Sequence, residues 1–397
     1  MLKCPNMQSQ IERVKICYII TKGVWGGAQK YVYNLATSMP KETYDVLVIC
    51  GAGNILKDKL ESSGIRVMEL QSLKRDISLI KELKSFLYLF KIIFREKPHV
   101  LHLNSPKAGG LGAFVALVIR ILAFLTFSTY KGPKAIYTAH GWTFNEKRKN
   151  LQTLAIIFLS WIIVIMCSKT IVIAKREKRQ AMEMPFVRDE KVVLIRNGLE
   201  KINLLQKSEA RKKLLELAGK EIPEKAFWIG SFAELHKNKG LEYAISAISK
   251  LTYPTVFFVI GEGEERKELE RHVNDFNLQD KIFLVGFLEN ASQYLSAFDL
   301  FLSSSIKEGL PYSILEAGLA ELPIVTTGVG GIPDIIDNGI NGILVTKEKP
   351  GEMTRAIDYL VLNEDKRKAF SQSLKEKVEK EFSFEKMLQK TMEVYNG

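Results

Sequence analysis

Two glutamates on either side of a Gly-Leu-Pro segment are the residues of this chain best suited to do chemistry. Glu308 and Glu316 are separated by seven residues, which include Gly309, Leu310, Pro311 and Tyr312. An apolar strand at 300–302 precedes them, and proline suits the first turn of a helix. The pattern predicts a tight loop at 309–312 that enters a helix running to about 320.

The start of such a helix offers unpaired backbone N–H groups and a positive dipole end, where phosphates bind. Glu308 lies just before this helix start and Glu316 about one turn inside the helix. One carboxylate can therefore face the reactive part of a ligand while the other grips a more distant hydroxyl. The alternative is an ordinary strand, loop and helix that carry two solvated glutamates.

A basic segment occupies a similar place after an earlier strand. His236, Lys237 and Lys239 follow a strand expected at 226–232 and precede Gly240 and a helix expected at 241–250. Cationic side chains beside a helix start can clamp a pyrophosphate. A solvated basic loop is the alternative.

The first half of the chain offers a glycine turn. Gly26 and Gly27 lie between a strand at 14–20 and a helix at 28–39, and glycines there let the backbone approach a phosphate or a sugar closely. The turn has no G-x-G-x-x-G pattern, which argues against a nicotinamide site. A structural turn is the alternative.

Two histidines follow strands in the same half. His140 comes just past a strand at 135–138 and precedes Gly141, so it could hydrogen-bond a sugar hydroxyl or act as a base toward an acceptor. His102, at the end of a strand at 100–103, is a weaker candidate. A structural role is the alternative for each.

The elements that must position these residues alternate between short apolar strands and helices. Such repeated units predict parallel sheets covered on both faces, with ligands at the carboxyl ends of the strands. The pattern restarts after a linker at 199–207. We therefore expect an α/β protein with two Rossmann-like domains, 1–200 and 201–383, that face each other across a cleft. A glycine-rich loop at 328–334 is a candidate for lining that cleft, and a plain turn is the alternative.

Charge and hydropathy narrow the class of partner. The 397-residue chain has a formal net charge of +12, which favours acidic partners, and it carries no nucleic-acid motif. The stretch 151–168 has no charged residue, and 108–130 has only Arg120. Both are borderline for membrane spans, so buried or interfacial helices are expected. The basic runs 147–149 and 175–179 flank the second stretch and suit either solvent or anionic headgroups.

The start of the chain and its cysteines predict a compartment. Residues 1–13 are polar, without the apolar core of a signal peptide, and the four cysteines show neither metal-binding nor redox spacing. The sequence therefore predicts a cytoplasmic protein.

Taken together, the motifs resemble those of the family 4 glycosyltransferases, which have the GT-B architecture. The resemblance covers nearly the whole chain and is carried by these segments: Gly26 to Gln29, His140-Gly141, 234–240, the E-x7-E pair with its Gly-Leu-Pro core, and 330–333. It implies a retaining transfer from a nucleotide sugar. It also implies that the final segment, 384–397, packs back on the first domain.

The resemblance assigns roles residue by residue. Glu316 would hold the ribose hydroxyls, Glu308 the hydroxyls of the transferred sugar, and Lys239 the phosphates. The backbone of 310–312 would touch the diphosphate, which Gly27 would approach from the first domain. His140 would contact the transferred sugar and help stabilise the reacting centre.

One position departs from the family pattern. Glu234 stands where the family usually has an arginine, and a carboxylate cannot neutralise a diphosphate. Either His236 or Lys237 substitutes for it, or Glu234 faces away. The chain also lacks a D-x-D motif and any cluster with metal-ligand spacing. We therefore expect no cofactor and no protein-bound metal, with the diphosphate charge met by lysines and helix ends.

The resemblance, with no metal motif in the chain, implies a retaining, metal-independent hexosyltransferase that moves a hexose or N-acetylhexosamine from a nucleotide-diphosphate sugar. The expected acceptor is a glycan or a polyprenyl-diphosphate-linked sugar of bacterial polysaccharide assembly. The basic surface and apolar helices place the protein peripherally at the cytoplasmic face of an anionic membrane. A nucleotide-sugar epimerase of GT-B fold and a non-catalytic, membrane-associated nucleotide-binding subunit are the alternatives.

Overall fold

A computed structural model describes residues 13–73 and 79–397 of the chain. The chain divides into two compact units. Of the described residues, unit 1 contains 13–73, 79–172, 180–193 and 392–397, and unit 2 contains 173–179 and 194–391. This division begins earlier than the linker expected at 199–207.

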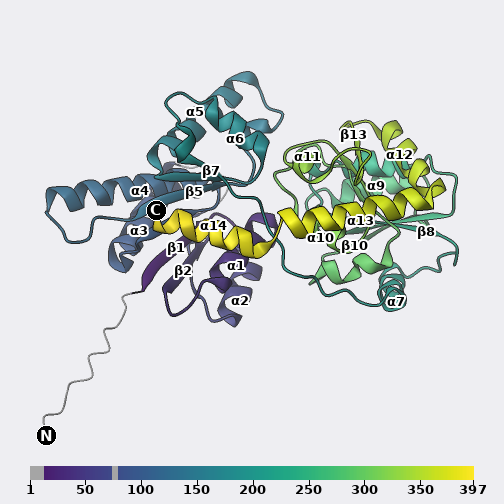
Figure 1. Cartoon of the computed structure of the whole chain (residues 1–397), viewed down its shortest axis with the longest axis horizontal. Coiled ribbons are helices and arrows are strands. Elements are labelled where there is room, and N and C mark those ends of the chain that lie inside the picture. Colours follow the sequence, from purple (N-terminus) through teal and green to yellow (C-terminus); the bar gives the residue numbers. More distant parts are fainter. Residues whose placement is uncertain (1–12, 74–78) are drawn as a thin grey trace, which may run out of the picture. The chain divides into compact units, whose positions relative to one another are not determined.

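Unit 1 is built on a seven-stranded parallel sheet, which has the order β3-β2-β1-β4-β5-β6-β7 (Figure 1). Its strands are β1 (Val14–Ile20), β2 (Tyr44–Cys50), β3 (Arg66–Glu69), β4 (Val100–Leu103), β5 (Lys134–Ala139), β6 (Lys169–Val172) and β7 (Val192–Leu194). The central strands are rich in buried apolar residues, as β1 illustrates with five in succession, Ile16 to Ile20. A strand of this kind is buried on both faces, which is the environment of a parallel sheet covered by helices.

The helices of unit 1 cover the two faces of this sheet in groups. Because parallel crossovers are right-handed, the strand order places α1 (Gly27–Ser38) and α2 (Asn54–Ser62) on one face. The same rule places α3 (Leu79–Glu96), α4 (Pro106–Leu125) and α5 (Asn150–Met166) on the other. Helix α3 packs against α4, and α4 packs against α5.

Unit 2 is built on a six-stranded parallel sheet, which has the order β10-β9-β8-β11-β12-β13. Its strands are β8 (Phe227–Phe232), β9 (Thr255–Ile260), β10 (Ile282–Gly286), β11 (Leu300–Ser303), β12 (Ile324–Thr327) and β13 (Ile343–Val345). Its helices are α7 (Lys207–Ala218), α8 (Leu241–Ile248), α9 (Arg266–Asp275), α10 (Tyr312–Leu319), α11 (Ile332–Ile335), α12 (Pro350–Leu362) and α13 (Glu364–Glu381). Much of the core lies between the sheet and helices α8, α9 and α12.

Two helices have residues in both units. Helix α6 (Lys175–Met182) begins in unit 2 and ends in unit 1. Helix α14 (Phe384–Asn396), which corresponds to the final segment expected to pack on the first domain, begins in unit 2, and its last residues, from Met392 on, belong to unit 1. The prediction of two Rossmann-like parallel sheets is confirmed.

The apolar stretches of the first half form helices α4 and α5. Among the described residues, only α4 is both long and apolar enough to cross a membrane. In its most apolar stretch of 18 residues, 39% is buried inside the protein. Helix α5 is apolar but shorter.

Candidate functional site

The glutamate and lysine segments of unit 2 meet where the strand order of its sheet reverses. Strands β8 and β11 are neighbours, yet the chain continues from β8 to β9 on one side and from β11 to β12 on the other. The loops that follow β8 and β11 therefore lie next to each other at the carboxyl end of the sheet. Open α/β sheets bind their ligands at such a reversal of the strand order.

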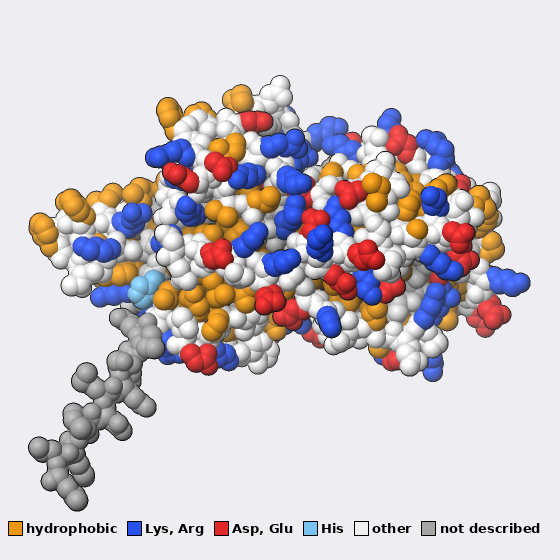
Figure 2. Space-filling model, in the orientation of Figure 1, with side chains coloured by type: hydrophobic (Ala, Val, Ile, Leu, Met, Phe, Trp, Pro, Cys, Tyr) orange, Lys and Arg blue, Asp and Glu red, His pale blue; other side chains and the backbone are white. Residues whose placement is uncertain are grey.

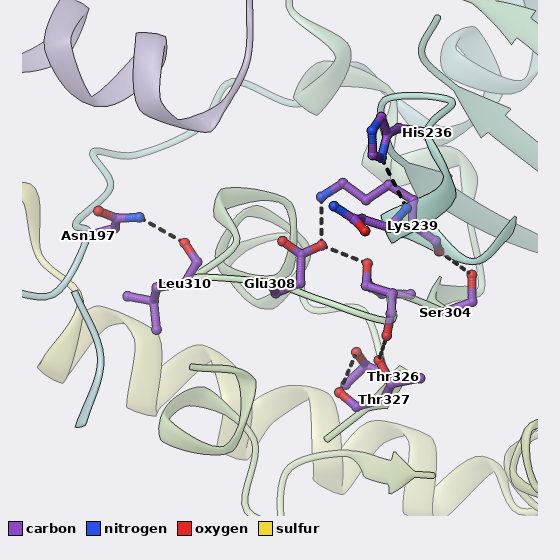
Figure 3. Close-up of polar contacts among 11 residues, drawn as sticks. Asn197, His236, Lys239, Ser304, Glu308, Leu310, Thr326 and Thr327 are labelled. Carbon is purple, nitrogen blue, oxygen red and sulfur yellow. Dashed lines mark hydrogen bonds and ion pairs between the residues drawn. The ribbon is translucent and has the colours of Figure 1, made fainter. Parts of the chain in front are cut away.

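Lys239 and Glu308 form an ion pair at this point. Lys239 lies in a short 3-10 helix, Lys237–Lys239, which follows β8, and its Nζ donates to Glu308 Oε1 at 2.6 Å (Figure 3). The hydroxyl of Ser305 donates to the same oxygen at 2.6 Å. The Glu308 side chain is only 11% exposed. Two donors thus hold the carboxylate in one orientation.

Hydrogen bonds to backbone carbonyls fasten the two loops to each other. The amide of Ile306 donates to the carbonyl of Asn238 at 2.8 Å, and the hydroxyl of Ser304 donates to the carbonyl of Lys239 at 2.9 Å. The hydroxyl of Thr327, at the end of β12, donates to the carbonyl of Ser305 at 2.5 Å. The lysine and the glutamate are therefore parts of one braced structure.

Two glycines with left-handed backbone make this bracing possible. Gly240 has φ 56°, and a Cβ there would lie 2.5 Å from the carbonyl oxygen of Ser304. Gly330 has φ 59°, and a Cβ there would lie 2.0 Å from the carbonyl oxygen of Glu308. The next amide, of Gly331, donates to the carbonyl of Gly309 at 2.6 Å. The glycine-rich loop at 328–334 thus packs against the Glu308 loop and supports it.

Helix α10 begins directly after this loop, as the sequence predicts. Pro311 is its N-cap residue and Tyr312 its first residue. Asn197, which is buried, donates from Nδ2 to the carbonyl of Leu310 at 2.8 Å and so holds the entry to the helix. Glu316 is buried one turn inside α10.

The other two candidates of the basic segment, His236 and Lys237, have contacts different from those of Lys239. Of the basic residues in this segment, His236 accepts a hydrogen bond at Nδ1 from the amide of Asn238 and so caps the 3-10 helix. The side chain of Lys237 is 78% exposed, with its Nζ 4.0 Å from Glu265. Glu234 is exposed to solvent. The roles of His236 and Lys237 in donor binding therefore stay predictions.

In unit 1 the candidate residues also follow central strands. Gly26 is the N-cap of α1 and Gly27 its first residue, and both are exposed. They follow β1, the strand beside which the sheet order reverses. His140 follows β5 and is half-buried, with Nε2 3.4 Å from Asn104 Oδ1. Burial lowers the pKa of His140 to about 4, so that the ring is neutral at physiological pH.

His102 has a structural role, the alternative that the sequence left open. The ring is fully buried, and both of its nitrogens are hydrogen-bonded, Nε2 to Thr138 Oγ1 at 2.7 Å and Nδ1 to Tyr395 Oη at 2.6 Å. The hydroxyl of Tyr395, in α14, also donates to that of Tyr18 at 2.9 Å. Burial lowers the pKa of His102 to about 3, and nearby His140 lowers it further.

Several supporting residues have no individual signal in the sequence. Ser305, Thr327 and Asn197 act through contacts with segments distant along the chain, and their residue types are common in loops. For Ser305 alone, the run of three serines that begins at the end of β11 offers a hint. Within residues 13–73 and 79–397, no group of three or more His, Cys, Asp or Glu side chains could hold a metal ion.

Comparisons with known proteins agree with this geometry. The model of the family described as glycosyl transferases group 1 matches residues 214–377, and the model of glycosyltransferase family 4 matches residues 25–201. With the two parallel sheets, these matches define the chain as a glycosyltransferase of the GT-B fold class.

The chain is also similar to individual proteins over nearly its whole length. It is 26% identical to an Escherichia coli UDP-Gal:alpha-D-GlcNAc-diphosphoundecaprenol alpha-1,3-galactosyltransferase, over 98% of both chains. It is 24% identical to the capsular polysaccharide biosynthesis glycosyltransferase CapM of Staphylococcus aureus, over 90% of both. The crystal structure of Anabaena HepE with UDP and glucose shares its fold, with a TM-score of 0.80 and 20% identity over 97% of this chain and 100% of that one.

Proposed function

We propose that this glycosyltransferase moves a hexose or N-acetylhexosamine from a UDP-sugar to a diphosphate-linked sugar on a polyprenyl carrier, at the cytoplasmic face of the membrane. The observation that carries the donor side is the Lys239–Glu308 pair beside the start of α10. The name of the E. coli relative, which specifies UDP-Gal and a diphosphoundecaprenol acceptor, supports the donor base and the acceptor class.

The transfer breaks the bond between the anomeric carbon and the donor diphosphate, and it forms a bond to an acceptor hydroxyl. Negative charge grows on the leaving diphosphate, whose oxygen takes the acceptor's proton. Lys239 and the amides at the start of α10 would stabilise this charge without reorganising, which is electrostatic preorganisation. Donor binding would draw Lys239 from Glu308 toward the phosphates and leave the carboxylate to accept from sugar hydroxyls. Glu316 would accept from the ribose.

We propose that the anomeric configuration is retained and that no metal takes part, since lysine and helix amides can meet the diphosphate charge. Gly26, Gly27 and His140 are proposed donor contacts in unit 1. The neutral ring of His140 suits a hydrogen bond to a sugar hydroxyl better than it suits pairing with phosphate.

The test is a transfer assay with UDP-galactose, UDP-glucose, UDP-N-acetylglucosamine and their GDP counterparts. The acceptor is N-acetylglucosamine diphosphate on a short, water-soluble alkyl chain. We expect one UDP-sugar to give a disaccharide product by mass spectrometry, equally with EDTA and with magnesium, and an α-linkage by NMR. Glu316→Gln should raise the KM for the donor. Release of an epimerised sugar without acceptor, or no product from any donor, would refute the proposal.

A further inference from the structure

The exposed apolar side chains of this protein are concentrated on one group of helices. In the described part of the chain, 27 large hydrophobic side chains are exposed, and 17 of them lie on α3, α4 and α5 or at Phe127, just after α4. Within this group of 17, the most exposed are Phe127 (94%), Phe124 (80%) and Leu151 (80%). Soluble proteins seldom expose contiguous apolar surface on this scale without a partner for it.

These helices are neighbours, so their apolar side chains form one surface. Helix α3 packs on α4, with the rings of Phe86 and Phe114 5.3 Å apart, and α4 packs on α5. One end of α4 extends beyond the sheet of unit 1 (Figure 1), and hydrophobic side chains gather over it (Figure 2). We name the exposed apolar side chains of α3, α4 and α5, together with Phe127, the apolar face.

The charge around the apolar face is mainly positive. Residues 79–166, which span the three helices and their connections, contain twelve lysines and arginines but only three glutamates. Lys84, Lys91, Lys147 and Lys149 are exposed among them. All three glutamates have basic partners: Glu82 pairs with Lys107, Glu96 with Arg66 and Arg95, and Glu146 with Arg148.

We propose that the apolar face inserts into an anionic phospholipid bilayer, with Phe124 and Phe127 entering the acyl boundary and the surrounding lysines meeting the headgroups. An apolar surface with a basic border is what an interfacial protein presents to lipid. A second copy of the chain is the weaker partner, because two such surfaces would bring like charges together. The inference rests on the proposed function, since docking there would bring the enzyme to a carrier-linked acceptor.

The test is vesicle cosedimentation of the full-length protein with equal parts of phosphatidylglycerol and phosphatidylcholine. Phe124→Ser/Phe127→Ser should weaken binding about a hundredfold, since two phenylalanines lose their burial in lipid. The matched control is Ile340→Ser/Leu362→Ser, whose side chains in unit 2 are 65% and 67% exposed. It should bind like the wild type. Both variants change exposed side chains, so their melting temperatures should stay near that of the wild type.

A second pair of variants tests the charge. Lys147→Glu/Lys149→Glu should weaken vesicle binding about tenfold or more, and high salt should reduce the wild-type binding by a similar factor. Lys347→Glu/Lys349→Glu makes the same change in net charge on exposed residues of unit 2 and should bind like the wild type.

Three outcomes would overturn the proposal. These are wild-type protein that ignores the vesicles, phenylalanine variants that bind as well as the control, and a wild-type dimer that the variants convert to monomer without any binding to lipid. Transfer to the water-soluble acceptor separates this inference from the proposed function. Normal transfer without vesicle binding would refute only the docking surface, whereas vesicle binding without transfer to any acceptor would refute only the function.

Discussion

Gly330 offers the sharpest test of the idea that the glycine-rich loop supports Glu308. A Cβ at this position would lie 2.0 Å from the carbonyl oxygen of Glu308, whereas ordinary contacts start at 3.4 Å. In Gly330→Ala the Glu308 loop must therefore move by about 1.4 Å, since its backbone is the obstacle. The left-handed backbone at φ 59° adds strain of about 1–2 kcal/mol for any residue with a Cβ.

Gly339→Ala provides the matched control in the same unit. Gly339 has a similar backbone, with φ 75°, but a Cβ there would meet nothing within 4 Å. Backbone strain alone should lower the unfolding free energy of this variant, by about 1–2 kcal/mol. Gly330→Ala adds overpacking, typically about 1–3 kcal/mol, and should lose about 2–5 kcal/mol in all.

Urea unfolding gives the stabilities, and transfer rates measured well below the melting temperature give the activities. Because a misplacement of about 1 Å at a reacting centre can cost about a hundredfold in rate, Gly330→Ala should lose about that much kcat. Gly339→Ala should keep the wild-type rate. Equal stability and equal activity in the two variants would show that the contact with the Glu308 carbonyl does not position the site.

Three further predictions follow from the ion pair and from the buried network of unit 1. Lys239→Met should lower kcat by a factor of about 10²–10³. The control, Lys250→Met at an exposed lysine, should keep the wild-type kcat. Equal kcat values in the two variants would show that Lys239 does not stabilise the transition state. Tyr395→Phe deletes the hydroxyl that bonds His102 and should lower the unfolding free energy by about 1–3 kcal/mol, and an unchanged melting temperature would contradict this. The folded-state pKa of His102, about 3, lies below its ordinary value of 6.5, so its contribution is present above pH 6.5 and is lost as the pH falls. Relative to pH 8, unfolding at pH 5 should cost on the order of 2 kcal/mol less on account of His102, and His102→Gln should flatten this pH dependence.

The local pattern of the sequence determined the elements and the outline of the unit 2 site. Strands β1, β2, β4 and β9 have the limits that their apolar runs predict, because a buried parallel strand needs a continuous run and turn residues end it. The sequence also predicted a helix start next to Pro311, and the structure places this proline at the N-cap, directly before the first turn.

The tertiary structure alone decided which side chains meet. Lys239 and Glu308 are 69 residues apart and pair because β8 and β11 are sheet neighbours, a fact of topology that no local pattern contains. The sequence showed only that His102 and His140 each lie at or just past the end of a strand. Burial and partners distinguish them, since His102 is sealed between Thr138 and Tyr395.

Helices α4 and α5 show the same division between what the sequence determines and what the tertiary structure decides. Composition marked 108–130 and 151–168 as apolar but left open whether they are buried or exposed. That depends on how much of each helix its neighbours cover. The sheet and adjacent helices cover one side of α4 and leave side chains such as Phe124 in solvent. Periodicity could not reveal this, because a helix that is apolar on every side has no face to distinguish.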